Sequence, residues 1–144
     1  MSPEGHVVRI EMPSSFELLD LVQLLSDRLS ALAGLDEDST HWVSVAVRES
    51  AINAIKHGNR EDRAKRVTVE FTLRPRAKPG EFIIGVLDEG AGFEPDMVAN
   101  PLDPENMLKS SGRGIFFMRS FMDDVSIERR PEGGMAVRKR KKLA

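Results

Sequence analysis

The sequence has no cysteine and no tyrosine among its 144 residues, and only one tryptophan. Without cysteine the chain can form no disulfide, offers no thiol nucleophile and has no thiolate for a metal, which suits a reducing compartment. It also lacks an apolar run long enough to span a bilayer, and its first residues lack the basic segment and apolar stretch of a signal peptide. We therefore expect a cytoplasmic protein that does not enter the membrane.

Neither sign of charge dominates the chain. The formal net charge is −2 at pH 7, which provides no overall attraction to nucleic acid or to an anionic membrane. Hydrophobic residues make up 40% and charged residues 31%, as is ordinary for a globular domain. A chain of this length can build one hydrophobic core, so we expect residues 1–144 to form a single domain.

The order of the periodic segments predicts an α+β fold. Alternating or continuous apolar residues predict five strands, at residues 6–12, 66–73, 82–87, 125–129 and 135–141. Helical periodicity predicts three helices, at residues 16–32, 38–57 and 114–122. Prolines and glycines indicate a loop over most of residues 88–111. Because the helices are segregated from the hairpins, we expect a two-layer α/β sandwich, with helices covering one face of a mostly antiparallel mixed sheet.

The run Arg138-Lys139-Arg140-Lys141-Lys142 is strongly basic. It could contact an acidic partner. We interpret it instead as a solvated edge strand whose charges discourage edge-to-edge association.

The predicted helix over residues 38–57 has a polar side opposite a wide apolar side. At 100° per residue the polar side carries Glu49, Ser50, Asn53, Lys56 and His57. Asn53 could offer an oxygen to Mg²⁺, and Glu49 could accept a proton from a hydroxyl that attacks a phosphate. On this segment alone, a solvated face of an amphipathic helix is the simpler interpretation, and His57 is placed as an ordinary partner of the helix dipole.

Asp88 directly follows an apolar strand and begins the segment Asp88-Glu89-Gly90-Ala91-Gly92-Phe93. A carboxylate held at a strand end can accept a hydrogen bond from an exocyclic amine such as that of adenine. Gly90 and Gly92 would let the backbone approach a flat ligand, and Phe93 could pack beneath the loop. An acidic turn after a strand explains the same residues equally well.

A second glycine segment, Ser110-Ser111-Gly112-Arg113-Gly114, precedes the apolar helix that starts at Ile115. Backbone N–H groups at a helix N-terminus bind phosphate, and Lys109 and Arg113 would add positive charge. The segment is not a P-loop, because the chain contains no Gly-x-x-x-x-Gly-Lys-Ser/Thr. A flexible linker before a capped helix is the alternative.

In their order and spacing, the three segments together resemble the nucleotide site of the GHKL ATPases. Glu49-x-x-x-Asn53-x-x-x-His57 resembles the N box, Asp88-x-Gly90-x-Gly92-Phe93 the adenine-binding box, and Gly112-Arg113-Gly114-Ile115 the second glycine box. Within this superfamily the chain is most similar to the bacterial anti-sigma factor serine/threonine kinases. Residues 45–58, residues 112–118 and the segment Met122-Asp123-Asp124-Val125 carry that similarity.

The resemblance implies a histidine kinase-like ATPase fold that binds Mg-ATP. Asn53 would ligate Mg²⁺, Glu49 would be the general base for a protein serine or threonine hydroxyl, and Asp88 would hold the adenine amine. Residues 109–115 would close over the phosphates. The implied nucleotide-contacting residues are Asn53, His57, Asp88, Gly90, Gly92, Phe93, Lys109, Ser110, Ser111, Gly112, Arg113, Gly114 and Ile115.

The resemblance also implies protein partners. The substrate would be a small anti-anti-sigma (STAS) protein and the second partner a sigma factor. The chain would pair as a homodimer through the surface near its first strand and helix. Neither nucleic acid nor a membrane is an expected partner.

Met135 departs from the family, which often has threonine at this point of the last hairpin, where its hydroxyl supports the adenine. Methionine has no hydroxyl, and residues 94–109 contain few basic groups. An alternative function is therefore a nucleotide-gated module that sequesters a partner without phosphorylating it. A histidine-kinase catalytic domain is disfavoured, because the chain has no separate phosphoacceptor helix pair and His57 would lie inside the nucleotide site.

Overall fold

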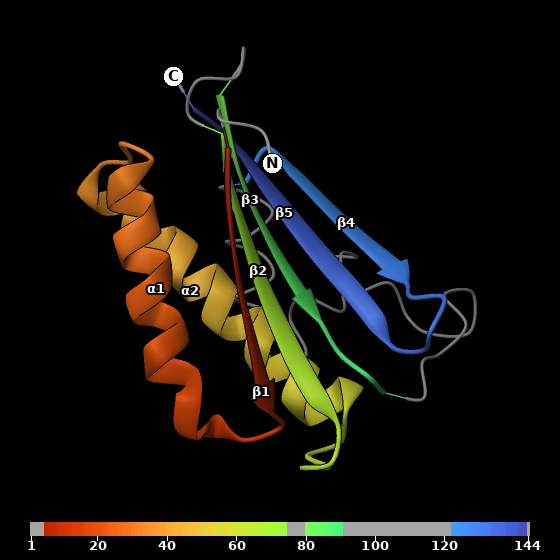
Figure 1. Ribbon diagram of the computed structural model, residues 1–144. Coiled ribbons are helices and arrows are strands. Elements are labelled where there is room, and N and C mark those ends of the chain that lie inside the picture. The colour runs from red at the N-terminus through yellow and green to blue at the C-terminus, as the bar shows by residue number, and fades with distance from the viewer. Residues whose placement is uncertain (1–4, 75–79, 91–121, 144) are drawn as a thin grey trace, which may run out of the picture.

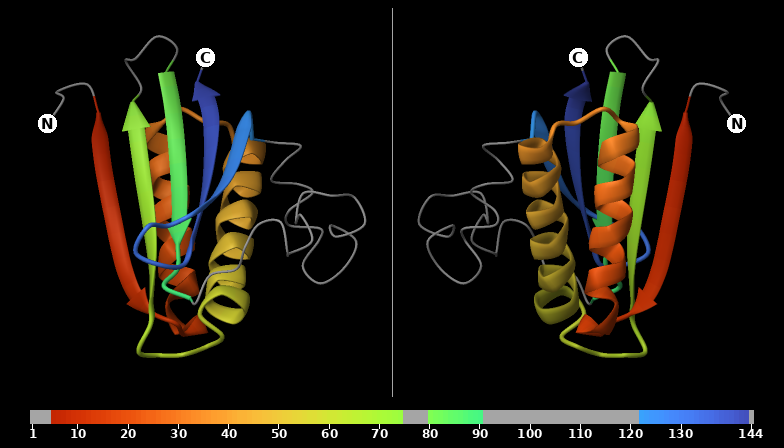
Figure 2. Two further views of the ribbon diagram at one scale, coloured as in Figure 1. Left: turned by 90° about the vertical axis from the view of Figure 1, so that its right-hand side faces the viewer. Right: turned by 90° about the vertical axis from the view of Figure 1, so that its left-hand side faces the viewer.

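The computed structural model describes residues 5–74, 80–90 and 122–143. In these segments one sheet is covered on one face by two helices (Figures 1 and 2). The strands are β1 (His6–Pro13), β2 (Arg66–Arg74), β3 (Gly80–Leu87), β4 (Asp124–Arg129) and β5 (Met135–Leu143). The helices are α1 (Leu19–Leu32), preceded by the 3₁₀ turn η1 (Phe16–Leu18), and α2 (Glu37–Asn53), continued by the π-helical turn η2 (Ala54–Gly58).

The sheet has the strand order β1-β2-β3-β5-β4. Every pairing between the described strands is antiparallel, so the α+β two-layer prediction is confirmed and this sheet is more uniform than the mixed one expected. β5 lies between β3 and β4, and therefore brings the end of the described chain into the interior of the sheet (Figure 1).

The predicted strand alternation is clearest in β2, where Val67, Val69, Phe71 and Leu73 are buried and the residues between them are not. These side chains face the helices because successive residues of a strand point to opposite faces. Phe71 stacks on Phe82 of β3 with ring centroids 6.3 Å apart. The helices complete one hydrophobic core, mainly through Val22 of α1 and through Val43, Val47 and Ile55 of α2 and η2.

Local capping explains where the helices begin and end. The Ser15 hydroxyl accepts the N–H of Glu17 at the start of η1, and the Asp36 carboxylate accepts the N–H of Ser39 at 2.7 Å at the start of α2. Gly34, with a φ of +81°, follows α1. The last turn predicted for the second helix is π-helical, because the N–H of Asn59 donates to the carbonyl of Ala54, five residues earlier.

The prediction of a solvated edge strand at residues 138–142 is wrong. β5 is an interior strand, and its residues alternate between the open face of the sheet and the helix-covered face. On the open face Arg140 donates to Asp124 at 2.6 Å, and Arg138 lies 3.8 Å from Glu128. Lys139 points the other way and is fully buried. Arg138 and Arg140 therefore pair across strands and Lys139 lies inside, while Lys142 is exposed. Strand periodicity without pairing information cannot show this arrangement.

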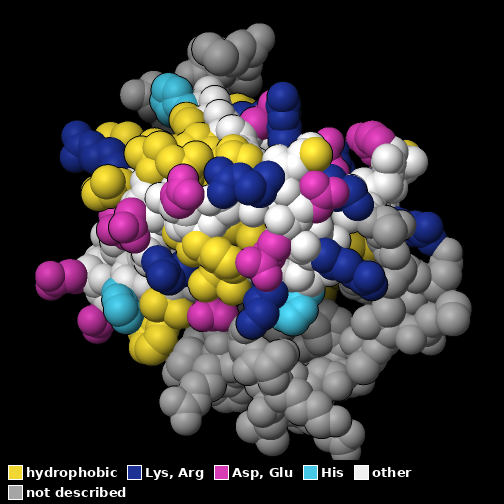
Figure 3. All heavy atoms as spheres, turned by 90° about the horizontal axis from the view of Figure 1, so that it is seen from below, with side chains coloured by type: hydrophobic (Ala, Val, Ile, Leu, Met, Phe, Trp, Pro, Cys, Tyr) yellow, Lys and Arg dark blue, Asp and Glu magenta, His cyan; other side chains and the backbone are white. Residues whose placement is uncertain are grey.

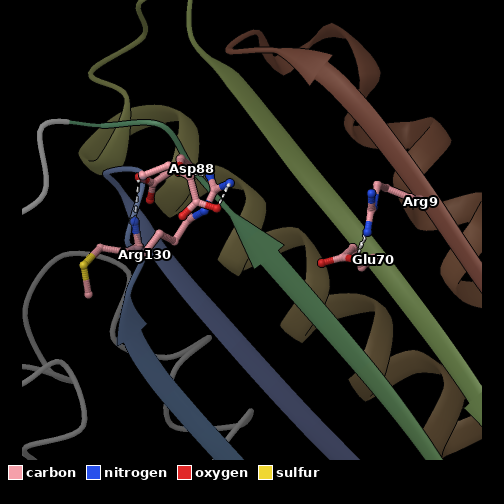
Figure 4. Close-up of polar contacts among 6 residues, drawn as sticks. Arg9, Glu70, Asp88 and Arg130 are labelled. Carbon is pink, nitrogen blue, oxygen red and sulfur yellow. Dashed lines mark hydrogen bonds and ion pairs between the residues drawn. The ribbon is translucent and has the colours of Figure 1, made fainter.

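The open face of the sheet carries further cross-strand ion pairs. Arg9 of β1 donates to Glu70 of β2 at 2.7 Å (Figure 4). Opposite charges on neighbouring strands suit a solvated sheet face.

No helix in the described segments has the length and apolar character needed to cross a membrane.

Candidate functional site

Asp88 lies just beyond β3 and is held rigidly by its surroundings. Its side chain is buried, with 6% of the residue exposed. Oδ1 accepts the N–H of Gly90 at 3.0 Å and the N–H of Met135 at 3.1 Å, and the N–H of Asp88 donates to the carbonyl of Met135 at 3.0 Å. Both side-chain bonds end on Oδ1, so Oδ2 receives no donor from the described residues. Among the described residues, both hydrogen bonds to this carboxylate therefore fall on the same oxygen.

Burial raises the pKa of Asp88. The amides of Gly90 and Met135 oppose that rise, as do the charges of Arg130 and Lys65. Because two N–H groups already bind Oδ1, the carboxylate orientation is set before any ligand arrives. A fixed acceptor beside a strand end matches the predicted role of Asp88 as the partner of an exocyclic amine.

Three glycines close around Asp88, one from each neighbouring segment. A Cβ added to Gly58 would overlap Oδ2 of Asp88, and one added to Gly90 would lie 2.7 Å from the carbonyl carbon of Gly58. A Cβ on Gly134 would lie 2.7 Å from the carbonyl carbon of Asp88, and Gly134 also has a φ of +92°. The turn η2, the loop after β3 and the β4–β5 turn therefore meet at backbone contact around this carboxylate.

Two of these three glycines did not stand out in the sequence. In the sequence, Gly58 follows the second predicted helix and Gly134 lies between the last two predicted strands, so a helix stop and a turn explain them. Gly90 was predicted to admit a ligand, whereas the structure shows that it also admits the backbone of Gly58. Glycine-asparagine and glycine-glycine pairs are such common stop and turn signals that only the contacts identify their second role.

Asn59 is a further structural element of the site. It is 1% exposed. Its Nδ2 donates to Ser14 Oγ at 2.8 Å and to the carbonyl of Arg66 at 2.9 Å, while its Oδ1 accepts the N–H of Glu89 at 2.8 Å. One buried amide therefore joins the end of β1, the start of β2 and the loop after Asp88. No pattern in the sequence marks Asn59 as a residue that joins these three segments.

Arg130, just beyond β4, binds the backbone of Asp88. Its Nη1 donates to the carbonyl of Asp88 at 2.6 Å (Figure 4). The backbone N–H of Arg130 also donates to the carbonyl of Gly134 at 2.9 Å, which closes the β4–β5 turn. The backbone of Asp88 is thus bound to both ends of that turn.

Glu49 and Asn53 lie four residues apart on α2, so their side chains are neighbours, and both are half-buried. Burial raises the pKa of Glu49, and the neighbouring Arg48 opposes that rise. Arg48 is itself turned toward α1, where its Nη1 donates to Gln23 Oε1 at 2.8 Å. A carboxylate with a raised pKa suits a proton acceptor that works near neutral pH.

Two other residues of the predicted polar side behave differently. His57 is exposed in η2, beside Gly58. Ser50 is buried rather than solvated, because it accepts a hydrogen bond from Lys139 of β5. The polar side of α2 is therefore narrower than the 100° projection indicated.

The remaining predicted contacts lie outside the described residues and stay predictions. They are Gly92, Phe93, Lys109, Ser110, Ser111, Gly112, Arg113, Gly114 and Ile115. Residues 114–121 of the predicted helix and most of the loop before it also lie there, whereas Met122, its last predicted residue, is buried in a bend before β4.

The described residues fit a magnesium nucleotide by their donor chemistry. Within the described parts of the chain no three His, Asp or Glu side chains converge on a common metal position. Asn53 offers a single neutral oxygen, as suits Mg²⁺ that takes most of its ligands from phosphates and water. Asp88 offers a carboxylate acceptor against which the backbone of three glycines is packed.

Comparison with known proteins agrees with this chemistry. Residues 12–141 match the family model described as "Histidine kinase-like ATPase domain". The chain is 35% identical over 121 residues to the anti-sigma F factor of Bacillus subtilis (strain 168), covering 80% of this chain and 79% of that protein. It is 24% identical over 135 residues to the serine-protein kinase RsbW of the same organism, covering 89% and 81%. It is 26% identical over 139 residues to RsbW of Staphylococcus aureus, covering 91% and 84%.

Proposed function

Because this chain belongs to the histidine kinase-like ATPase domain family, and within it to the anti-sigma factor serine/threonine kinases, we propose that it is a bacterial anti-sigma factor that binds Mg-ATP. Its proposed reaction is phosphorylation of a serine or threonine of an anti-anti-sigma (STAS) protein. That reaction would control the availability of a sigma factor. Residues 1–144 would act as a single domain, in the cytoplasm.

The observation that carries this proposal is the state of Asp88. Its carboxylate is oriented by two backbone N–H groups on Oδ1, while Oδ2 has no donor among the described residues. An adenine amine would supply the missing donor. A solvated acidic turn would not have this arrangement. Asp88→Ala would remove the acceptor.

Glu49 is the proposed general base. It would take the proton of the attacking hydroxyl as the oxygen bonds to the γ-phosphorus, and ADP would leave. Its raised pKa suits that step. Asn53, one turn further along α2, would bind Mg²⁺, whose positive charge would stabilise the phosphate oxygens.

Homodimer formation is a further part of the proposal. β1 is an edge strand, and α1 next to it leaves large apolar side chains in solvent, with Leu21, Leu24 and Leu32 exposed by 47%, 65% and 59%. Space-filling shows hydrophobic patches between charged side chains at one end of the molecule (Figure 3). Pairing through β1 and α1 would cover such residues. A Leu24→Glu variant that sediments as the wild type does would contradict this assignment.

The direct test of the kinase is transfer of label from γ-³²P-ATP to a STAS protein of the same organism. Wild-type protein should label that partner, and Glu49→Gln should abolish transfer while nucleotide binding is largely kept, because glutamine has nearly the same shape but accepts no proton. No transfer by wild-type protein that binds ATP in calorimetry would refute the kinase.

That same outcome would favour the alternative function, a nucleotide-gated module that sequesters its partner. Met135 motivates this alternative, since it stands beside Asp88 without a hydroxyl. Partner capture that survives both Glu49→Ala and Asn53→Ala would support it.

A further inference from the structure

Lys139 of β5 is buried under α2, with 0% of its surface exposed. Its cross-strand neighbours are Ile84 of β3 and Val125 of β4, both apolar. Its Nζ donates to the backbone carbonyl of Ala46 at 3.3 Å and to the hydroxyl of Ser50. No carboxylate of the described residues forms an ion pair with it. The amine therefore forms its hydrogen bonds with one turn of α2.

That turn is the one that carries Glu49. Ala46 and Ser50 are four residues apart and lie on either side of Glu49 in the sequence, so Nζ binds the start and the end of the turn. Two bonds from one atom restrain both the sliding of α2 along the sheet and its rotation about its own axis. Apolar packing alone resists these motions less, because it has no preferred direction.

The same strand also contacts the base site. Met135, at the start of β5, exchanges two hydrogen bonds with Asp88. Lys139 follows four residues later, which is about 13 Å along a strand. β5 therefore connects the acceptor for the base to the helical turn of the general base.

We propose that Lys139 is a positioning residue for phosphoryl transfer: by binding Ala46 and Ser50, it sets the place of Glu49 relative to the strand that holds Asp88. The inference rests on the proposed kinase function. It assigns Lys139 no contact with nucleotide or substrate.

A lysine with a purely structural role would affect turnover and nucleotide binding differently from a positioning residue. If the amine only filled space, a methionine of similar length would serve as well, and turnover would not change. If the amine held the whole fold together, its loss would weaken nucleotide binding and turnover in parallel. A positioning role predicts a fall in kcat with nucleotide affinity nearly intact, because Asp88 is held by contacts that do not involve Lys139.

The test compares Lys139→Met with Lys142→Met, a matched change at an exposed lysine of the same strand. ATP affinity is measured by calorimetry, and kcat and KM for the STAS protein by label transfer. Lys139→Met should lower kcat by about tenfold to a hundredfold, since displacement of a reacting group by about 1 Å can cost that much. Its ATP Kd and its KM should change by less than about twofold. Lys142→Met should match the wild type.

Ser50→Ala provides a second, milder variant that leaves the buried amine in place. Ser50→Ala should also lower kcat. The double variant should be no slower than Lys139→Met, because Lys139→Met alone already removes the bond between Lys139 and Ser50. Wild-type kcat in Lys139→Met, or a parallel loss of ATP binding, would overturn the positioning role. If Lys139→Met does not fold, wild-type kcat in Ser50→Ala overturns it. Absence of transfer by wild-type protein would instead refute the kinase, and this inference with it.

Discussion

Replacing Lys139 by methionine should make the protein more stable at neutral pH. Burial lowers the pKa of this lysine from 10.5 to about 7, and the difference corresponds to a cost of about 5 kcal/mol for the charged form in the folded state. Near pH 7 about half of the folded molecules carry the charge, and the cost is then about 4 kcal/mol. Methionine removes this cost of burying the charge. It also removes the hydrogen bonds of the amine to the carbonyl of Ala46 and the hydroxyl of Ser50, which lowers the free energy of unfolding by about 1–3 kcal/mol.

The dependence on pH is the sharper part of this prediction. Between pH 7 and pH 10.5 the unfolded chain binds a proton at Lys139 that the folded chain does not. The free energy of unfolding of the wild type therefore gains about 1.4 kcal/mol per pH unit from this residue in that window. Lys139→Met lacks this contribution. Because half of the folded molecules are still protonated at pH 7, the advantage of the variant should shrink by about 2 kcal/mol between pH 7 and pH 9.

Urea unfolding of wild type, Lys139→Met and Lys142→Met at half-unit steps over this range measures the effect. Lys142 is exposed, so Lys142→Met should follow the wild-type curve at every pH. Parallel curves for wild type and Lys139→Met would refute the reasoning, since they would mean that the lysine titrates alike in both states.

Three further variants test the site. Asp88→Asn should fold normally, because its Oδ1 can still accept both N–H groups. It should weaken ATP binding by about tenfold to a hundredfold in calorimetry, since an amide nitrogen would face the adenine amine. Unchanged affinity would contradict the role of Asp88. Asn59→Ala should lower the free energy of unfolding by about 2–4 kcal/mol in urea, because the buried amide of Asn59 makes three hydrogen bonds that alanine cannot make. Asn53→Ala, at a half-buried position, should be nearly neutral for stability. Gly134→Ala should lower both the melting temperature and the ATP affinity, since its Cβ would displace Asp88. Wild-type ATP affinity in this variant would show that the β4–β5 turn does not shape the proposed nucleotide site.

The strands and helices were predictable because each follows one period. β2 alternates without interruption, and Gly34 follows a helix as a C-terminal glycine does. The position of β5 was not predictable, since its residues say nothing about which strands flank it. Five consecutive basic residues indicate solvent exposure, and only the pairing with β3 and β4 shows that the middle of this run is covered by α2.

The candidate site divides in the same way. Asp88, Glu49 and Asn53 are predicted from their spacing and chemical type, and their roles stay predictions; the structure shows that Asp88 is buried and that Glu49 and Asn53 are half-buried. Asn59, Gly134 and Lys139 were missed because their importance lies in contacts with residues far away in the chain. Asn59 reaches Ser14 across 45 positions, and Lys139 reaches Ser50 across 89. Local patterns hold no information about such distances.

The place of β5 also has a consequence for biosynthesis. β3 is made before β5, yet β5 is its neighbour on one side. A nascent chain that has emerged only as far as β4 has the residues of α2 and Asp88, but it lacks Met135 to orient the carboxylate and Lys139 to hold the helix. Proteins emerge from the ribosome in order, so such a chain has an open β3 edge and an unformed base site. Residues 135–143 must therefore be synthesised before β5 can pair with β3, and under the proposed function nucleotide binding would depend on that part of the chain.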